Sequence, residues 1–230
     1  MNQKEKIAML KKVILLSLFA VAVSFICLGQ SYAVTLIPTD DSPTYSAHPD
    51  TNYDTGTSND GLWTGKFYGT ADTMSYIKFD LSAIPVNLGT ATLYLYNAYS
   101  SYPSAPSLST FAPAVVNTYL TSNAWTESTI TWNNQPAIGT ASGSTTVNTP
   151  VGWYSWDVSN IAKTAQGGYF SIAMTSDGAG HLYYGKDNLC PGPYLAVTMT
   201  PEPVSSILFI TGGATLALKR CWKRKRSKRV

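Results

Sequence analysis

Tyr76-Ile77-Lys78-Phe79-Asp80-Leu81-Ser82 is the stretch that decides the fold class of this 230-residue chain. Its apolar residues Ile77, Phe79 and Leu81 stand at every second position, and successive side chains of a β-strand point to opposite faces. The same alternation recurs in Leu93 and Leu95, in Tyr154, Trp156 and Val158, in Phe170, Ile172 and Met174, and in Leu195, Val197 and Met199. These runs predict half-buried strands.

The connections between the runs are rich in Gly, Pro, Asn and Ser, which break regular structure. One short helix is expected around residues 159–166, ended by Gly167-Gly168. Many short strands with turn-rich connections predict an all-β domain, a single β-sandwich or jelly roll. Cys190 is the only cysteine between residues 34 and 200, so no disulfide is expected within this domain.

The first 33 residues have the pattern of a secretory signal peptide. Lysines at positions 4, 6, 11 and 12 precede an apolar run over residues 13–28, and Ser31-Tyr32-Ala33 offers small residues for cleavage. We therefore expect signal peptidase to cut after Ala33 and the mature protein to work outside the cytoplasm.

The last 30 residues combine Pro201-Glu202-Pro203, an apolar stretch over residues 204–218, and a basic cluster from Lys219 to Arg229. Such a Lys/Arg excess flanks the cytoplasmic end of membrane helices. The order of the three parts resembles the PEP-CTERM sorting signal, which implies processing near Pro-Glu-Pro by an exosortase-type protease. The alternative is an ordinary single-span anchor, although about 15 residues at roughly 1.5 Å each fall short of a ~30 Å hydrocarbon core.

The charge of the predicted exported domain differs in sign from that of the whole chain. Residues 34–200 hold four lysines, no arginine and eleven acidic residues, a formal charge of −7, whereas the whole chain carries +3. A domain that binds nucleic acid needs a basic surface for the phosphate backbone. Nucleic acid is therefore not expected as a partner.

Several segments in order along residues 34–200 resemble one known family. They are His48-Pro49-Asp50-Thr51-Asn52-Tyr53, Tyr76-Ile77-Lys78-Phe79-Asp80-Leu81-Ser82, Ala91-Thr92-Leu93-Tyr94-Leu95-Tyr96, Trp125-Thr126-Glu127-Ser128-Thr129-Ile130-Thr131-Trp132-Asn133-Asn134-Gln135-Pro136, Trp156-Asp157-Val158-Ser159 and Pro193-Tyr194-Leu195-Ala196-Val197. Together they are similar to the DNRLRE domain, also called carbohydrate-binding module family 96. The resemblance implies a β-sandwich. Some members bind acidic glycans such as alginate as modules of polysaccharide-degrading enzymes, and others occur on surface proteins.

The chain departs from this family near its C-terminal end. Tyr184-Gly185-Lys186-Asp187 stands where the family usually carries a Ser-Arg-Glu type triplet. Lys186 supplies a cation there, but the guanidinium fork that clamps a carboxylate with two hydrogen bonds is missing.

Aromatic residues near Gly, Ser or Pro are the candidates for stacking against a sugar ring. They are Trp63, Tyr68, Tyr99, Tyr102, Trp153 and Tyr183, each with a Gly, Ser or Pro within two residues. From this set we predict a carbohydrate-binding site of Trp63, Trp153 and Tyr183 together with Lys186. The competing interpretation is that such rings pack the sandwich, as we expect for Trp125 and Trp132.

A second candidate site is formed by Asp50, Asn52 and Asp54. Alternating oxygen ligands in one loop suit calcium, which takes about 6–8 oxygens. Asx-turns explain the same residues without a metal. Calcium is the one cofactor that the sequence suggests.

Catalysis is not expected. Glu127 is the only glutamate between the two ends, whereas glycosidases need two carboxyl groups. A lyase-like set of His181, Tyr184 and Lys186 is a third alternative, but His181 and Tyr184 are three apart and would point to opposite faces of a strand. We therefore predict an exported, non-catalytic cell-surface or matrix protein that associates with polysaccharide. A structural surface protein without glycan specificity is the main alternative.

Overall fold

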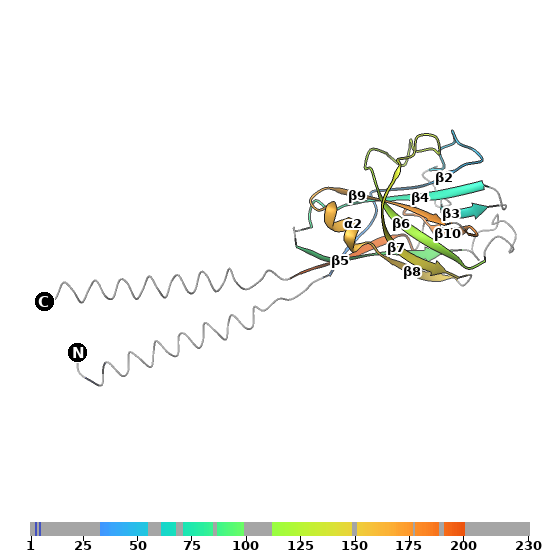
Figure 1. The fold of residues 1–230 in the computed structure, drawn as a ribbon. Helices are drawn as coiled ribbons and strands as arrows, with labels where there is room; N and C mark the ends of the chain where they lie inside the picture. Colours follow the sequence, from blue (N-terminus) through green and yellow to red (C-terminus); the bar gives the residue numbers. More distant parts are fainter. Residues whose placement is uncertain are drawn as a thin grey trace. The chain divides into compact units, whose positions relative to one another are not determined.

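The computed structural model describes residues 3, 5, 33–54, 61–67, 71–84, 87–98, 112–148, 151–176, 178–188 and 191–200 (Figure 1). The predicted sorting tail and all but residues 3, 5 and 33 of the predicted signal peptide lie outside these residues, as do Tyr68, Tyr99 and Tyr102. Tyr32–Met199 form one compact unit. Within the described residues, no helix has both the length and the apolar character needed to cross a membrane.

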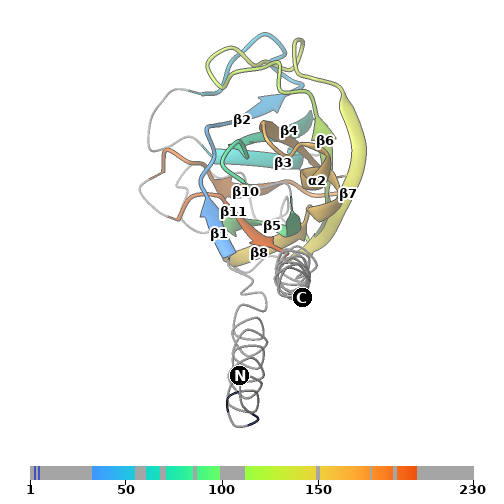
Figure 2. The same cartoon turned by 90° about the vertical axis from the view of Figure 1, so that its left-hand side faces the viewer.

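The unit is an all-β sandwich, as the sequence predicts. The first sheet contains β1 (Ala33–Leu36), β11 (Tyr194–Met199), β5 (Leu88–Asn97), β8 (Gly152–Asp157) and β10 (His181–Tyr184). The second contains β2 (Asp40–Tyr45), β4 (Ala71–Asp80), β9 (Tyr169–Ser176), β6 (Ala114–Thr121) and β7 (Ile138–Val147). In Figure 2, β2, β4 and β6 lie in the upper layer and β1, β11, β5 and β8 in the lower one. Every named strand pairing is antiparallel.

Strand β3 (Gly61–Phe67) joins the two sheets by changing partner at a glycine. Its first four residues pair with β10, and Gly65, Lys66 and Phe67 pair with β4. Gly65 has φ +106°, and a Cβ atom there would lie 2.6 Å from the carbonyl oxygen of Ala179. Only glycine tolerates both conditions, so Gly65 lets one strand turn the corner between the layers.

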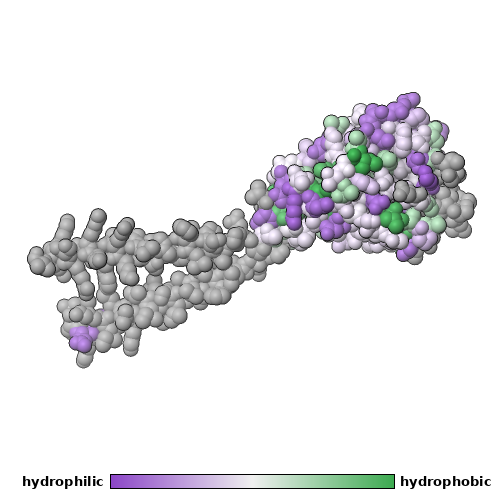
Figure 3. All heavy atoms as spheres, in the orientation of Figure 1, coloured by the Kyte–Doolittle hydropathy of each residue, from purple (hydrophilic) through white to green (hydrophobic). Residues whose placement is uncertain are grey.

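The core lies between the sheets and uses the alternating residues of the sequence runs. Ile77, Phe79 and Leu81 are fully buried, and so are Leu93 and Leu95 from the opposite layer. The predicted helix is present as α2 (Ser159–Thr164), which buries Ile161 and Ala162. On the face shown in Figure 3, strongly hydrophobic residues form small separate spots among polar ones.

A second, smaller core covers the outer face of the second sheet. The covering loop, residues 125–136, places Trp125 and Ile130 against Tyr76 of β4 and Ala173 of β9. The Trp125 and Tyr76 rings meet edge to face at 5.9 Å, and the Tyr76 hydroxyl donates to the carbonyl of Pro136 at 3.1 Å. Trp125 is therefore buried, as predicted, but outside the sheets instead of between them. Trp132 is only half-buried.

Candidate functional site

The four residues predicted to bind carbohydrate lie in separate surroundings. Trp63 is on β3, Trp153 is on β8, Tyr183 is inside β10, and Lys186 follows β10. Tyr183 lies in the core and Lys186 is paired with carboxylates, so the structure does not bring all four together into one site.

Tyr183 is a correction to the sequence prediction. Its side chain is fully buried, and its ring meets Trp156 edge to face at 5.9 Å in the core. Burial raises the pKa of its phenol well above the ordinary value. Tyr183 is a strand residue that points inward between Leu182 and Tyr184, so it has no face open to a sugar.

Trp153 is exposed, as a residue that contacts a ligand must be, and 45% of its surface is accessible. Its ring meets Tyr96 of β5 edge to face at 5.4 Å and Tyr194 of β11 at 5.1 Å. Tyr96 lies directly opposite Trp153 in the antiparallel pairing of β5 and β8. The contacts fix the orientation of the indole on the sheet surface.

Five rings continue this arrangement across four strands of the first sheet. Tyr94 stacks on Tyr194 at 4.7 Å with an interplanar angle of 10°, and Tyr96 stacks on Tyr184 at 5.8 Å with 16°. The aromatic platform, as we name this group, consists of Tyr94, Tyr96, Trp153, Tyr184 and Tyr194. These residues alternate along their strands with buried ones such as Leu93, Leu95 and Leu195, so the rings lie on the outer face of the sheet.

Sequence reasoning missed most of the platform. It selected aromatics near Gly, Ser or Pro, whereas Tyr94 and Tyr96 stand within an alternating strand run. The available signal was their register: they occupy the positions between Leu93 and Leu95 that a half-buried strand turns to solvent. The order of strands in the sheet decides which residues lie beside them, and this order could not be predicted from the sequence.

Trp63 borders the platform. It is half-buried on the outer face of β3, opposite Leu182 of β10, and its ring lies 6.5 Å from that of Tyr53. Tyr184 is two residues beyond Leu182 and so faces the same side of the sheet. Diagonal neighbours on adjacent strands come within reach of aromatic side chains. Trp63 therefore extends the aromatic surface from β10 toward β3.

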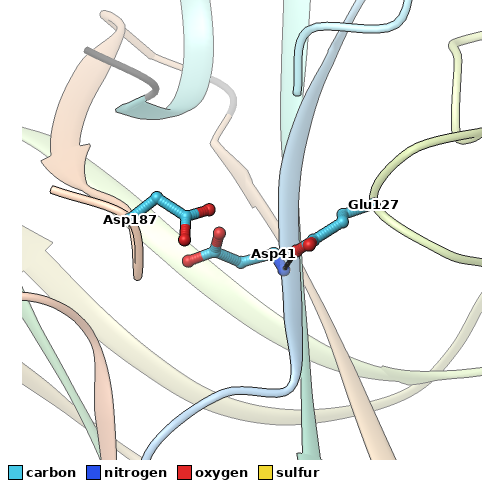
Figure 4. Close-up of side chains that lie close together, drawn as sticks. All are labelled: Asp41, Glu127 and Asp187. Atoms are coloured by element: carbon cyan, nitrogen blue, oxygen red, sulfur yellow. Dashed lines mark hydrogen bonds between the residues drawn. The ribbon is translucent and has the colours of Figure 1, made fainter. Parts of the chain in front are cut away.

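Lys186 belongs to a carboxylate cluster instead of a sugar platform. Oxygens of Asp41, Glu127 and Asp187 all lie within 4.8 Å of one another, with Asp41 between the other two (Figure 4). The Lys186 ammonium lies 3.0 Å from Glu127 and 2.8 Å from Asp187. The backbone N–H of Lys186 also donates to Asp41 at 2.7 Å. The lysine charge thus lies among three acidic side chains.

The cluster shifts the acidity of its members. Burial raises the pKa of Asp41 to about 7, although the hydrogen bond from the Lys186 N–H and the lysine charge act in the opposite direction. Burial alone would lower the pKa of Lys186, but its hydrogen bonds to Asp187 and Glu127 outweigh that effect and raise it. Lys186 therefore stays charged, and the carboxylates around it more than balance its charge.

The predicted calcium residues contact the covering loop. The amide of Asn52 donates to the carbonyls of Glu127 and Ile130, both at 2.7 Å. Asp50 accepts a hydrogen bond from the Asn133 amide at 2.7 Å. Asn52 and Asp50 thus hold the loop that covers the second sheet, and calcium binding by Asp50, Asn52 and Asp54 stays a prediction.

The lyase-like set does not converge. His181 is fully buried and faces inward, whereas Tyr184 stacks on Tyr96 on the outer face. Burial lowers the pKa of His181 to about 4, and neither imidazole nitrogen has a hydrogen-bond partner among the described residues. Lys186 is engaged by carboxylates. The three side chains therefore share no cleft.

An open hollow lies beside the covering loop on the second sheet. Its lining includes Asp40, Lys78, Trp125 and Tyr169. Lys78 donates to the carbonyl of Trp125, pairs with Asp40 at 3.3 Å, and lies 4.6 Å above the Trp125 ring. Its charge is therefore used to hold the loop in place, although Tyr169 remains 52% exposed.

Comparisons with known proteins cover the same part of the chain. The model of carbohydrate-binding module family 96 matches residues 32–199. No curated protein matches the chain. Among solved structures, the chain is similar to the K1 cleaved adhesin domain of Lys-gingipain from Porphyromonas gingivalis W83, with 12% identity and a TM-score of 0.31 over 74% of this chain and 98% of that one. The family match spans the sandwich and leaves the two ends of the chain outside it.

Proposed function

The chain belongs to carbohydrate-binding module family 96, and from this premise we propose that its sandwich attaches the protein to polysaccharide without chemical turnover. The observation that carries the proposal is the aromatic platform on the outer face of β5, β8, β10 and β11. Flat rings with one face toward solvent are suited to stacking against the C–H faces of pyranose rings.

The platform is also preorganised. Each ring contacts at least one other at 4.7–5.8 Å, and all five are carried by strands instead of loops. A site held by regular strands loses little conformational entropy when a ligand binds. Trp63, beyond β10, would lengthen the contact toward a second sugar along a chain.

On the sequence pattern we further propose where this binding takes place. Signal peptidase would release the chain after Ala33, and the C-terminal apolar segment would hold it at the membrane. An exosortase-type protease would then act near Pro201-Glu202-Pro203. The domain would work at the cell surface or in the extracellular matrix.

One observation favours a structural alternative. The platform rings contact one another, and cross-strand aromatic pairs stabilise a sheet by about 0.2–1 kcal/mol each. A surface protein that needs only a rigid sandwich, with no glycan specificity, could use the rings for this purpose alone.

Affinity electrophoresis of the purified chain through gels that contain single polysaccharides separates the two functions. We expect retardation by at least one polysaccharide, and loss of that retardation in Trp153→Ala. Tyr169→Ala is the matched control, because Tyr169 is the exposed aromatic of the other sheet. Loss in Tyr169→Ala alone would move the site to the hollow on the second sheet, and no retardation on any polymer would favour the structural alternative.

A further inference from the structure

The outer face of the first sheet is nearly free of charge. Besides the platform rings, its outward positions on β1, β5, β8 and β11 carry small or hydroxyl residues: Thr35, Thr90, Thr92, Ser155, Ala196 and Thr198. Asp157 is the only charged residue in the five strands of this sheet. Its carboxylate accepts hydrogen bonds from the N–H and hydroxyl of Ser159. Around the platform, the sheet therefore offers hydroxyl groups and ring faces, and no cation.

The lysines of the domain do not supply the missing cation. Residues 34–200 contain only Lys66, Lys78, Lys163 and Lys186, and no arginine. Lys66 pairs with Asp72 at 2.6 Å, and Lys78 pairs with Asp40 at 3.3 Å. Hydrogen bonds from Ser159 lower the pKa of Asp157, and the nearby charge of Lys163 on α2 adds to this effect.

Lys186 is the lysine closest in sequence to the platform, two residues after Tyr184. Its ammonium turns to Glu127 and Asp187, and Asp41 accepts its backbone N–H. A uronate carboxylate that approached Lys186 would meet these three acidic residues as well. The net charge there repels an anion instead of attracting it.

These observations indicate the chemical class of the ligand. A carboxylate laid against the platform would lose water without gaining an ion pair, which is costly. The formal charge of −7 over residues 34–200 adds long-range repulsion of any polyanion. A neutral chain presents C–H faces to the rings and hydroxyls to the threonines and serine. We propose that the platform selects uncharged polysaccharides and excludes polyuronates, an inference that rests on the proposed function above.

The test uses ligand pairs that differ only in charge. Several polyuronates are each compared with their carboxyl-reduced form, in which a CH₂OH group replaces the carboxylate on the same backbone. Binding of the purified full chain is measured by affinity electrophoresis at low and at moderate salt. We expect at least one reduced polymer to bind ten times more tightly than its parent, in a manner lost on Trp153→Ala. Any residual binding of the parent should rise with salt, because salt screens repulsion.

A charge placed on the platform sharpens the test. Ser155 is exposed on β8, directly opposite Tyr94. Ser155→Arg is expected to raise polyuronate binding about tenfold or more, while Ser155→Gln, without charge, leaves it low. Folding of both variants is checked by the temperature midpoint of unfolding.

Three outcomes would count against the inference and are distinguishable. A parent polyuronate that binds as tightly as its reduced form, with loss on Trp153→Ala, overturns the selectivity and leaves glycan binding by the platform intact. Polyuronate binding that is lost on Lys186→Gln but kept in Trp153→Ala moves recognition to the carboxylate cluster. Absence of binding to every polymer overturns the proposed function itself.

Discussion

The outer faces of the two sheets are formed by similar alternating strands but differ in what packs on them. On the second sheet, Tyr76 is buried under the covering loop and contacts Trp125. On the first sheet, Tyr94 and Tyr96 hold equivalent outward positions, yet their neighbours are other rings and solvent. An outward aromatic is thus structural or available to a ligand according to what covers it.

The two faces also show that a conspicuous sequence motif and a candidate binding site need not coincide. The long motif over residues 125–136 stands out in the sequence, and its role is to cover a sheet and to hold Lys78 and Asn52. The platform has no such motif and consists of tyrosines in ordinary strand runs with one tryptophan. In this protein the conspicuous motif at residues 125–136 stabilises the fold, whereas the candidate site is formed by aromatic residues without a sequence motif.

Trp125→Ala should have the largest effect, because it breaks the covered face. Trp125 is 7% exposed, and its indole N–H donates to Ser171 at 3.2 Å. We expect the free energy of unfolding to fall by about 3–5 kcal/mol, the usual cost of removing a buried tryptophan. Trp153→Ala on the open face should cost about 1 kcal/mol or less while abolishing glycan binding. Urea unfolding of both variants measures the contrast, and equal losses would show that the platform is a structural core.

Asp41→Asn should reveal how pH acts where the covering loop meets the segment after β10. The pKa of Asp41 is about 7 in the fold and 3.8 when exposed, so between these values the folded state holds a proton that the unfolded state has released. Stability from this group is present below about pH 4 and is lost as pH rises to about 7, by roughly 2–4 kcal/mol.

The asparagine variant removes this contribution and leaves the opposing one of His181, so its stability should rise from pH 4 to 7. Its side-chain oxygen can still accept the Lys186 N–H. Asp72→Asn, outside the cluster, is the control and should keep the wild-type profile. Urea unfolding between pH 4 and 8 makes the measurement, and an unchanged slope in Asp41→Asn would mean that the carboxyl is ionised in the fold at neutral pH.

His181→Leu tests a pH effect on stability of opposite sign, which arises from a residue inside the first sheet. Burial lowers the pKa of His181 from 6.5 to about 4, so the unfolded state binds the extra proton between these values. Its contribution to stability is present above about pH 6.5 and is lost as pH falls toward 4, by roughly 1–3 kcal/mol. Asp41 and His181 therefore offset each other over this range in the wild type.

In His181→Leu only the Asp41 effect should remain, so stability should fall steadily from pH 4 to 7 in urea titrations. His48→Leu changes the other histidine, which is exposed, and serves as the control. If the stability of His181→Leu depended on pH as little as that of the wild type, the opposing contributions of Asp41 and His181 would be disproved.

Trp63→Ala should have the smallest effect, because it lies at the border of the open face. Loss of one edge contact worth about 0.5–1 kcal/mol weakens binding roughly two- to fivefold. The weakening is expected for long chains and absent for short oligosaccharides that occupy only Trp153 and its neighbours. Isothermal titration with oligosaccharides of increasing length measures it, and equal weakening at all lengths would place Trp63 inside the main site.

The sequence predicted more of the fold than of the site. Alternation identified the inward residues Ile77, Phe79 and Leu81, and strand geometry placed His181 and Tyr184 on opposite faces. Trp153 is exposed, whereas Tyr183, selected for the same predicted site, lies in the core. The error arose because the nearby Gly185 was weighed more heavily than strand register.

By itself, then, the sequence determined strands β4, β5, β8, β9 and β11, the short helix, the inward and outward register of those runs, and the scarcity of cations between residues 34 and 200. Only the tertiary structure decided that Tyr94 meets Tyr194 a hundred residues later, or that Lys186 meets Glu127 and Asp187. The alternation of inward and outward side chains has a period of two residues and can be seen in a short stretch of sequence. Neighbours across a sheet depend instead on the order of the strands, which involves distant parts of the chain. In the described part of the chain, the covering loop packs on the second sheet, and Trp153 on the first sheet stays exposed.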